Sequence, residues 1–174
     1  MEMSFSNIVG SPIFAEGNIR PLTTVKNLVI DPENGKLVAL VTDVHRNRIV
    51  SYMDIISWGR VVKVHDGDSI IDGNDVIKVE KLQKEGFEMI GAKVETKKGE
   101  VLGKVYNYYM NTSIMNLQRI CTAKGFLGLL RYETRVISAG DIIEMKRGKI
   151  IVKNNFGVVK VEANQQVALE DAAA

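Results

Sequence analysis

Cysteine is almost absent from this chain, and its scarcity excludes a disulfide framework. The 174 residues include one cysteine, Cys121, and a single thiol cannot close a bridge within the chain. Small secreted scaffolds that depend on several disulfides are therefore excluded. A lone cysteine agrees with a reducing compartment, and we expect a cytoplasmic protein.

Long apolar runs and a strong net charge are also missing. No segment reaches the roughly 20 apolar residues of a membrane-spanning helix, and the first residues lack the basic-then-apolar pattern of a secretory signal. The 23 Lys and Arg residues nearly balance the 21 Asp and Glu residues. This small excess of positive charge gives no reason to expect direct contact with nucleic acid. We expect neither a membrane span nor direct binding of nucleic acid.

Motifs of catalysis and of cofactor binding are missing as well. The sequence contains no GxSxG, P-loop, GxGxxG or CxxC pattern. A catalytic thiol would need a histidine partner, but His45 and His65 both lie in the first half, whereas Cys121 lies in an apolar stretch of the second. Cys121 is therefore interpreted as a small buried apolar side chain. We expect no enzyme activity, no catalytic residue and no cofactor.

One acidic segment, HDGDSIIDGND (residues 65–75), invites comparison with a calcium-binding loop. With Asp66 in the first position, such a loop needs glycine in the sixth and glutamate in the twelfth, but this chain has Ile71 and Ile77 there. Oxygen ligands cannot close around an ion in this pattern. We expect no metal site and interpret the segment as a solvated hairpin.

What the sequence does contain is an internal repeat. Gly10 and Gly91 stand 81 residues apart (91 − 10), and an apolar pair precedes each of them. Asn27 and Asn107 match at an offset of 80 (107 − 27). A fixed offset with matching residue types at special positions indicates a duplication.

The end of each copy also matches, and it sets the expected domain boundaries. In IISWGRVVKVHDGDSII and VISAGDIIEMKRGKIIV, Ser57 and Gly59 align with Ser138 and Gly140 at an offset of 81 (138 − 57). We expect two homologous units with a polar linker between them, followed by a final strand and tail. The expected divisions are unit 6–80, linker 81–86, unit 87–155, and strand with tail 156–174.

Both units have the local signature of β-structure. Short runs rich in Val and Ile, such as VKNLVI and KIIV, alternate with turn clusters such as DPENG. No ten-residue stretch has convincing helical periodicity. Several short strands in a unit of about 70 residues favour a closed barrel, because closure leaves few exposed strand edges. The expected fold class is all-β, with two tandem small β-barrels.

The second unit resembles the PRC-barrel domain. The segments MIGAKVETKKGEVLGKV (residues 89–105) and GFLGLLRYETRVISAGDII (residues 125–143) carry this resemblance over nearly the whole unit. The first unit is a diverged copy, because IRPLTTV (residues 19–25) stands where the second has VLGKV. The resemblance implies compact β-barrels that are used for protein contacts and share no catalytic motif.

The expected function is therefore non-enzymatic protein binding or scaffolding by two PRC-barrel-like repeats. The partner is an unidentified protein, and a homodimer is left open. One alternative is an accessory role in ribosome maturation or RNA processing, because the PRC-barrel family includes a domain of a ribosome maturation factor, although the signatures of RNA-binding modules are missing. The second alternative is a small-molecule-binding or enzymatic barrel.

Three residues are candidates for partner binding. Trp58 is the only tryptophan and aligns with Ala139, so the fold does not demand a large ring there. Phe126 and Leu127 lie at an expected hairpin tip, where the first unit has polar residues. The competing interpretations are local packing for Trp58 and folding over the barrel end for the other two. Residues 163–174 are expected to form a frayed end or a short surface helix.

Overall fold

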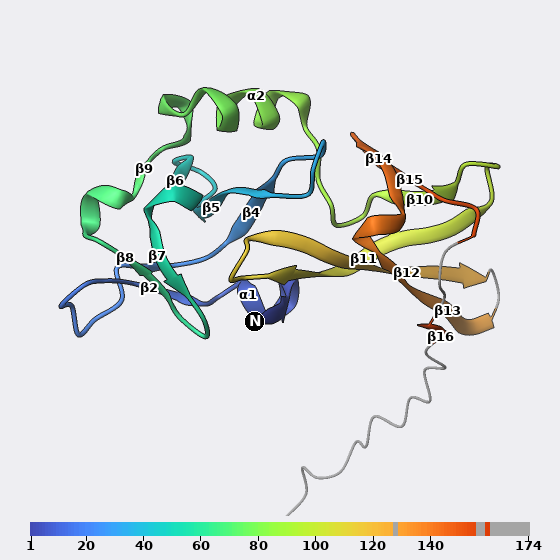
Figure 1. Cartoon of the computed structure of the whole chain (residues 1–174), viewed down its shortest axis with the longest axis horizontal. Coiled ribbons are helices and arrows are strands. Elements are labelled where there is room, and N and C mark those ends of the chain that lie inside the picture. Colours follow the sequence, from blue (N-terminus) through green and yellow to red (C-terminus); the bar gives the residue numbers. More distant parts are fainter. Residues whose placement is uncertain (127–128, 156–158, 161–174) are drawn as a thin grey trace, which may run out of the picture.

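The computed structural model describes residues 1–126, 129–155 and 159–160 (Figure 1). These residues form strands with a few short helices, so the all-β class is confirmed. None of the helices in this part of the chain has the length and apolar character that a membrane span requires.

The elements follow one another along the chain in this order. The first half contains β1 (Glu2–Ser4), α1 (Phe5–Ile8), β2 (Pro12–Ala15), β3 (Thr23–Thr24), β4 (Asn27–Ile30), β5 (Leu37–Asp43), β6 (Arg48–Ser51), η1 (Tyr52–Asp54), β7 (Ile55–Trp58), β8 (Val62–Val64), η2 (Gly67–Ser69), β9 (Ile71–Asp72), η3 (Gly73–Asp75) and α2 (Ile77–Glu85). The second half contains β10 (Lys93–Thr96), β11 (Val101–Asn111), β12 (Asn116–Phe126), β13 (Leu129–Ser138), η4 (Ala139–Asp141), β14 (Ile142–Lys146), β15 (Lys149–Val152) and β16 (Val159–Lys160).

The strands form three sheets. The largest has the order β14-β15-β10-β11-β12-β13-β16, with β1 pairing along β11. The other two have the orders β3-β2-β8-β7 and β4-β5-β6-β9. None of these sheets closes into a barrel within the described residues, so the expected pair of closed barrels is not confirmed.

The strand register repeats along the chain. Asn27 pairs with Val41 in β4–β5, and Asn107 pairs with Cys121 in β11–β12, at an offset of 80 in both strands. Each asparagine Oδ1 also accepts the backbone N–H of the next residue. We call β2–β8 the first repeat and β10–β15 the second repeat.

The offset increases after β5, which corrects the alignment that was expected near the end of each copy. The hydroxyl of Ser51 accepts the N–H of Met53 at the start of η1, and the hydroxyl of Ser138 accepts the N–H of Gly140 at the start of η4. Ser138 and Gly140 are therefore equivalent to Ser51 and Met53 at an offset of 87, not to residues 57–59. The β12–β13 hairpin is seven residues longer (87 − 80) than β5–β6, so one constant offset cannot align both sides of it.

This correction changes the counterpart of Trp58. Trp58 pairs with Val62 in β7–β8, and Met145 pairs with Ile150 in β14–β15. The counterpart of Trp58 is Met145 rather than Ala139. Both repeats hold a large apolar side chain at this position. The sequence interpretation compared the ring of Trp58 with the methyl group of Ala139, and that comparison is wrong.

Helix α2 occupies part of the segment that was expected to be a polar linker, residues 81–86. Its residues Val79 and Leu82 are buried against side chains of β5 and β6, and Gly86 ends it in a left-handed conformation. This helix has a weak sequence signature, because Val76 provides no side-chain cap and the apolar face is narrow.

The acidic segment at residues 65–75 is not a hairpin. The side chain of Asp66 accepts backbone N–H groups at the start of η2, and that of Asp72 does the same at the start of η3. Carboxylates are good helix-capping groups because they satisfy N–H groups that have no partner in the first turn. Asp66 and Asp72 therefore have a local structural role.

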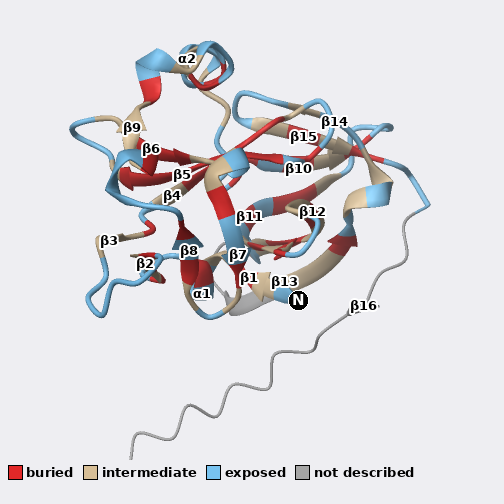
Figure 2. Ribbon diagram, turned by 60° about the vertical axis from the view of Figure 1, so that its left-hand side comes forward, coloured by how far each residue is buried: buried red, intermediate tan, exposed pale blue. Residues whose placement is uncertain are grey.

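One hydrophobic core extends through both repeats (Figure 2). Leu40 and Ile120, which are equivalent at the offset of 80, are fully buried and belong to this same core. A smaller cluster of buried side chains lies between α2 and the sheet that contains β4, β5 and β6. The two repeats therefore pack against each other through buried apolar side chains.

Candidate binding groove

A groove of about 420 Å3 runs along strand β4. Residues 26–30 form one wall, and the last turn of α2 with residues 86–90 forms the other. Side chains of a strand alternate between its two faces, so a groove that touches five successive residues follows the strand edge rather than one face. Its apolar lining includes Leu28, Ile30, Val44, Leu82, Phe87 and Ile90.

The edge of β4 is open where the equivalent edge of the second repeat is covered. Within the described residues, the sheet neighbour of β4 is β5 alone. Its equivalent, the second part of β11, has β12 on one side and β1 on the other, where Met3 pairs with Met110. The position equivalent to Met110 is Ile30, which lines the groove.

The segments that precede β2 and β10 are equivalent as well. Gly10 N–H donates to the carbonyl of Val25, and Gly91 N–H donates to that of Val105, both at 2.8 Å. Both glycines have a positive φ, 89° and 82°, which glycine adopts without a steric penalty. The expected equivalence of Gly10 and Gly91 is confirmed, and Ile8 corresponds to Met89 because the carbonyl of each accepts the N–H of the third residue after it.

The aromatic stack of Phe5 and Tyr108 is replaced by a different arrangement around β4, where the ring of Phe87 lies. Phe5 stacks on Tyr108, with ring centroids 4.8 Å apart and an interplanar angle of 24°. Leu28 is equivalent to Tyr108. Gly86 stands 81 residues after Phe5, but it ends α2 whereas Phe5 begins α1. Leu28, Gly86 and Phe87 line the groove, and so do Phe5 and Tyr108.

An ion pair between a buried carboxylate and a half-exposed lysine joins the end of β4 to α2. Asp31 follows β4 directly, and its Oδ2 lies 2.7 Å from the Nζ atom of Lys78 on α2. Burial by itself raises the pKa of the Asp31 carboxyl, but hydrogen bonds from Lys78 and from the N–H of Glu33 outweigh this effect and hold the pKa below its ordinary value. The lining itself carries one charge of each sign, Lys26 and Glu88.

Trp58 lies in the shared core. Its side chain is 7% exposed, and its Nε1 atom is buried without a hydrogen-bond partner in the described part of the chain. A ring with so little exposed surface cannot anchor a second protein unless the fold opens. Burial favours the packing interpretation, and a role in partner binding stays a prediction.

The other two candidates lie at the β12–β13 hairpin. Phe126 is the last residue of β12 and its backbone pairs with Leu129. Leu127 lies outside the described residues, as do residues 163–174. A role of Phe126 and Leu127 in binding stays a prediction, and so does the expected state of the C-terminal residues.

The structure confirms the interpretation of Cys121 as a buried apolar side chain. Cys121 is 5% exposed and is equivalent to Val41. Burial raises the pKa of its thiol, and this disfavours the thiolate that a nucleophile or a metal ligand requires.

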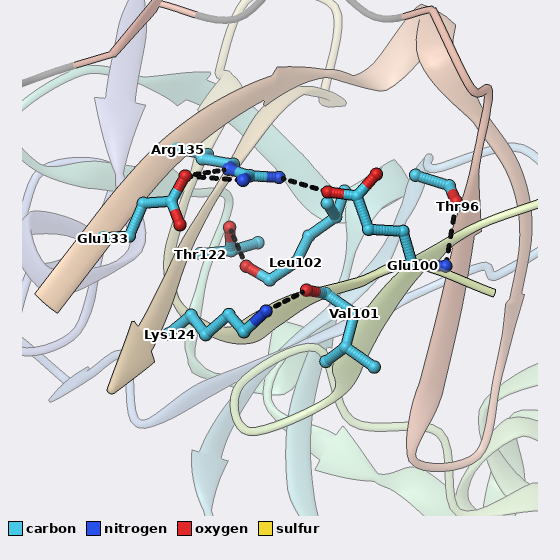
Figure 3. A network of polar contacts seen from close by, with 8 residues as sticks. All are labelled: Thr96, Glu100, Val101, Leu102, Thr122, Lys124, Glu133 and Arg135. Atoms are coloured by element: carbon cyan, nitrogen blue, oxygen red, sulfur yellow. Dashed lines mark hydrogen bonds and ion pairs between the residues drawn. The ribbon is translucent and has the colours of Figure 1, made fainter. Parts of the chain in front are cut away.

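A polar network connects three strands of the second repeat (Figure 3). The hydroxyl of Thr122 donates to the carbonyl of Leu102 at 3.2 Å, and the Nζ atom of Lys124 donates to the carbonyl of Val101 at 3.1 Å. Arg135 on β13 forms ion pairs with acidic side chains on either side. These contacts fasten β12 to the backbone of β11, which is a structural role.

The sequence interpretation missed the groove, although one signal for it was present. At the offset of 81 the chain has Gly86 in place of Phe5, and the aromatic residue that precedes β10 stands one position later, at Phe87. The helix that forms the second wall could not be read from the sequence. The groove can therefore be located only when the strands are paired in three dimensions.

Neither a metal-binding arrangement in the described residues nor a known relative indicates what the groove binds. No group of three or more His, Cys, Asp or Glu side chains in the described ranges is placed to hold a metal ion. A comparison of the chain with protein-family models finds no match, and no curated protein matches it either. The resemblance to the PRC-barrel family stays an expectation from the sequence.

Proposed function

We propose that the chain is a non-enzymatic protein-binding module of two PRC-barrel-like repeats, and that its partner binds in the groove along β4. The observation that supports this proposal is an apolar groove with an open strand edge on one side. A strand edge offers backbone donors and acceptors, and apolar walls offer surface to bury. Both are used in the recognition of extended peptides.

Apolar side chains at the rim of the groove add to this support. Val44 and Ile90 are 65% and 39% exposed, although both are apolar and line the groove. Covering apolar surface in a complex contributes roughly 25 cal/mol per Å2. A partner that covers this rim would therefore gain binding free energy from surface that faces water in the free chain.

A pair of matched substitutions tests the proposal. Val44→Glu places a charge at the rim of the groove, whereas Ile114→Glu places the same charge at a side chain of nearly equal exposure, 64%, which does not line it. Each variant and the unchanged chain are used to purify partners from the source cells, and the co-purifying proteins are quantified by mass spectrometry.

We expect at least one protein to co-purify with the unchanged chain and with Ile114→Glu but not with Val44→Glu. Thermal unfolding of both variants verifies that the exposed substitutions leave the fold intact. Equal recovery of every protein with the two variants would contradict the proposal. Loss of the partner on treatment with ribonuclease would favour the alternative role in RNA processing.

A further inference from the structure

We infer that the groove binds an extended segment of a partner protein as an added strand, antiparallel to β4, with an aromatic side chain of that segment over Leu28. This inference depends on the proposed function and specifies the chemistry of the partner. It follows from a comparison of two equivalent strand edges in the same molecule: β1 pairs along the edge of β11, whereas in the described residues no strand pairs along the corresponding edge of β4.

The filled place shows what such a strand edge accepts. Strand β1 lies antiparallel along β11, with Met3 opposite Met110 and Ser4 opposite Tyr109. The next residue, Phe5, begins a single helical turn and places its ring on Tyr108. The occupant of the second repeat is therefore a short extended segment followed directly by an aromatic anchor.

The backbone of β4 presents an N–H and a C=O group to the groove, as β11 presents them to β1. Asp31 N–H donates to the carbonyl of Lys36 at 2.9 Å, so this N–H points toward the β5 side of the strand. Backbone groups of successive residues point to opposite sides of an antiparallel strand, so the N–H and C=O of Ile30 point away from β5 and toward the groove. An added strand can therefore pair with Ile30 in the same way that Met3 of β1 pairs with Met110.

The open volume is suited to the aromatic anchor. Leu28 is smaller than Tyr108, and Gly86 contributes no side chain to the groove, which the ring of Phe87 also lines. The groove volume of about 420 Å3 lies within the range of roughly 300–1,000 Å3 that is typical of binding pockets. Because the lining carries one charge of each sign, burial of an apolar ring is favoured over recognition of a charged group.

The test uses a peptide that copies the natural occupant of the second repeat. A synthetic peptide with the sequence of residues 1–8, MEMSFSNI, is added to the full-length chain labelled with 15N, and the amide resonances are followed by NMR. The same peptide with Phe5→Ala is the matched control. We expect the resonances of residues 26–30 and 86–90 to shift, and the control peptide to bind about tenfold more weakly because it lacks the ring.

The groove variants locate the binding site. Val44→Glu should weaken binding of the peptide about tenfold, whereas Ile114→Glu should leave it unchanged. Equal affinity for the two peptides overturns the inference, and so do shifts confined to residues 109–111, which would show exchange of the peptide with β1. Concentration-dependent shifts at residues 26–30 without any peptide would identify a second copy of the chain as the occupant and overturn it too.

The two tests distinguish failure of the strand inference from failure of the proposed function. If Val44→Glu abolishes capture of the cellular partner while MEMSFSNI causes no shifts, the groove binds a protein in another manner and only the strand inference is wrong. If the peptide binds as expected while capture of partners is the same for both variants, the groove accepts a strand but the proposed function in the cell is wrong.

Discussion

Leu37 and Leu117 occupy equivalent positions in the two repeats, and each donates its backbone N–H to the other repeat. Leu37 N–H bonds to the carbonyl of Met115 at 2.8 Å, and Leu117 N–H bonds to that of Gly35 at 2.9 Å. Exchanging the repeats exchanges these two bonds, which is the pattern of a two-fold symmetric interface. The edges of β11 and β4 depart from this symmetry, because β1 pairs along the first and no strand of the described residues pairs along the second, and the proposed function depends on this difference.

Gly103 is expected to tolerate no side chain. Its φ is +112°, and a Cβ atom there would lie 2.3 Å from the carbonyl oxygen of Ala123 on the neighbouring strand. Gly103→Ala should therefore lower the free energy of unfolding by about 3 kcal/mol, because both backbone strain and a collision with backbone must be relieved. Urea unfolding followed by circular dichroism measures the change.

Gly99→Ala provides the control for Gly103→Ala. Gly99 also has a positive φ, +88°, but no atom lies within 4 Å of a Cβ atom at this position. Its substitution should cost only about 1 kcal/mol, from the backbone conformation alone. Equal costs for the two variants would show that the close approach of β12 to Gly103 is not rigid.

Trp58 is expected to stabilise the fold by packing. Trp58→Ala should lower the free energy of unfolding by about 3–5 kcal/mol, because it leaves a large cavity in the shared core. Trp58→Phe should cost much less, since it keeps most of the buried surface and removes an Nε1–H that has no partner in the described residues. A stable Trp58→Ala variant that loses its partner would instead restore the surface-anchor interpretation.

The Asp31–Lys78 pair predicts a specific pH dependence of stability. The pKa of Asp31 lies below its ordinary value of 3.8, so its stabilisation is fully present above that pH and is lost as the pH falls through the folded-state value. Asp31→Asn should cost about 1–2 kcal/mol at pH 7 and much less at pH 3. Because the second repeat has Asn111 at the equivalent position, the variant should keep the fold.

Urea unfolding at the two pH values measures this effect. The expected loss of unfolding free energy in Asp31→Asn is modest because Lys78 is about half exposed and regains water when its partner is removed. An unchanged difference between Asp31→Asn and the original chain at pH 3 and pH 7 would show that the carboxylate charge does not stabilise the fold.

The repeat and the all-β class could be predicted from the sequence because they depend on local patterns. Gly10 and Gly91 have left-handed conformations that favour glycine, and Asn27 and Asn107 bond to their own backbone, so each residue type marks its position. Such signals are independent of what lies elsewhere in the chain.

The groove could not be predicted because it depends on contacts between distant segments. The offset of 87 for Ser51 and Ser138 becomes visible only when the strands are paired, and it moves the counterpart of Trp58 from Ala139 to Met145. The covering of β11 by β1 likewise joins residues more than 100 positions apart. Without these pairings, a glycine in place of Phe5 carries no structural meaning.

The most direct test of the central asymmetry is the hydrogen-exchange rate of the Ile30 amide, measured against that of the Met110 amide in the same free chain. We predict that Ile30 exchanges at least about tenfold faster, because β1 covers the edge at Met110 whereas the edge at Ile30 faces the groove. Saturation with MEMSFSNI should slow exchange at Ile30 and leave Met110 unchanged. Equal protection of the two amides in the free chain would contradict the account, because it would mean that the edge of β4 is already covered.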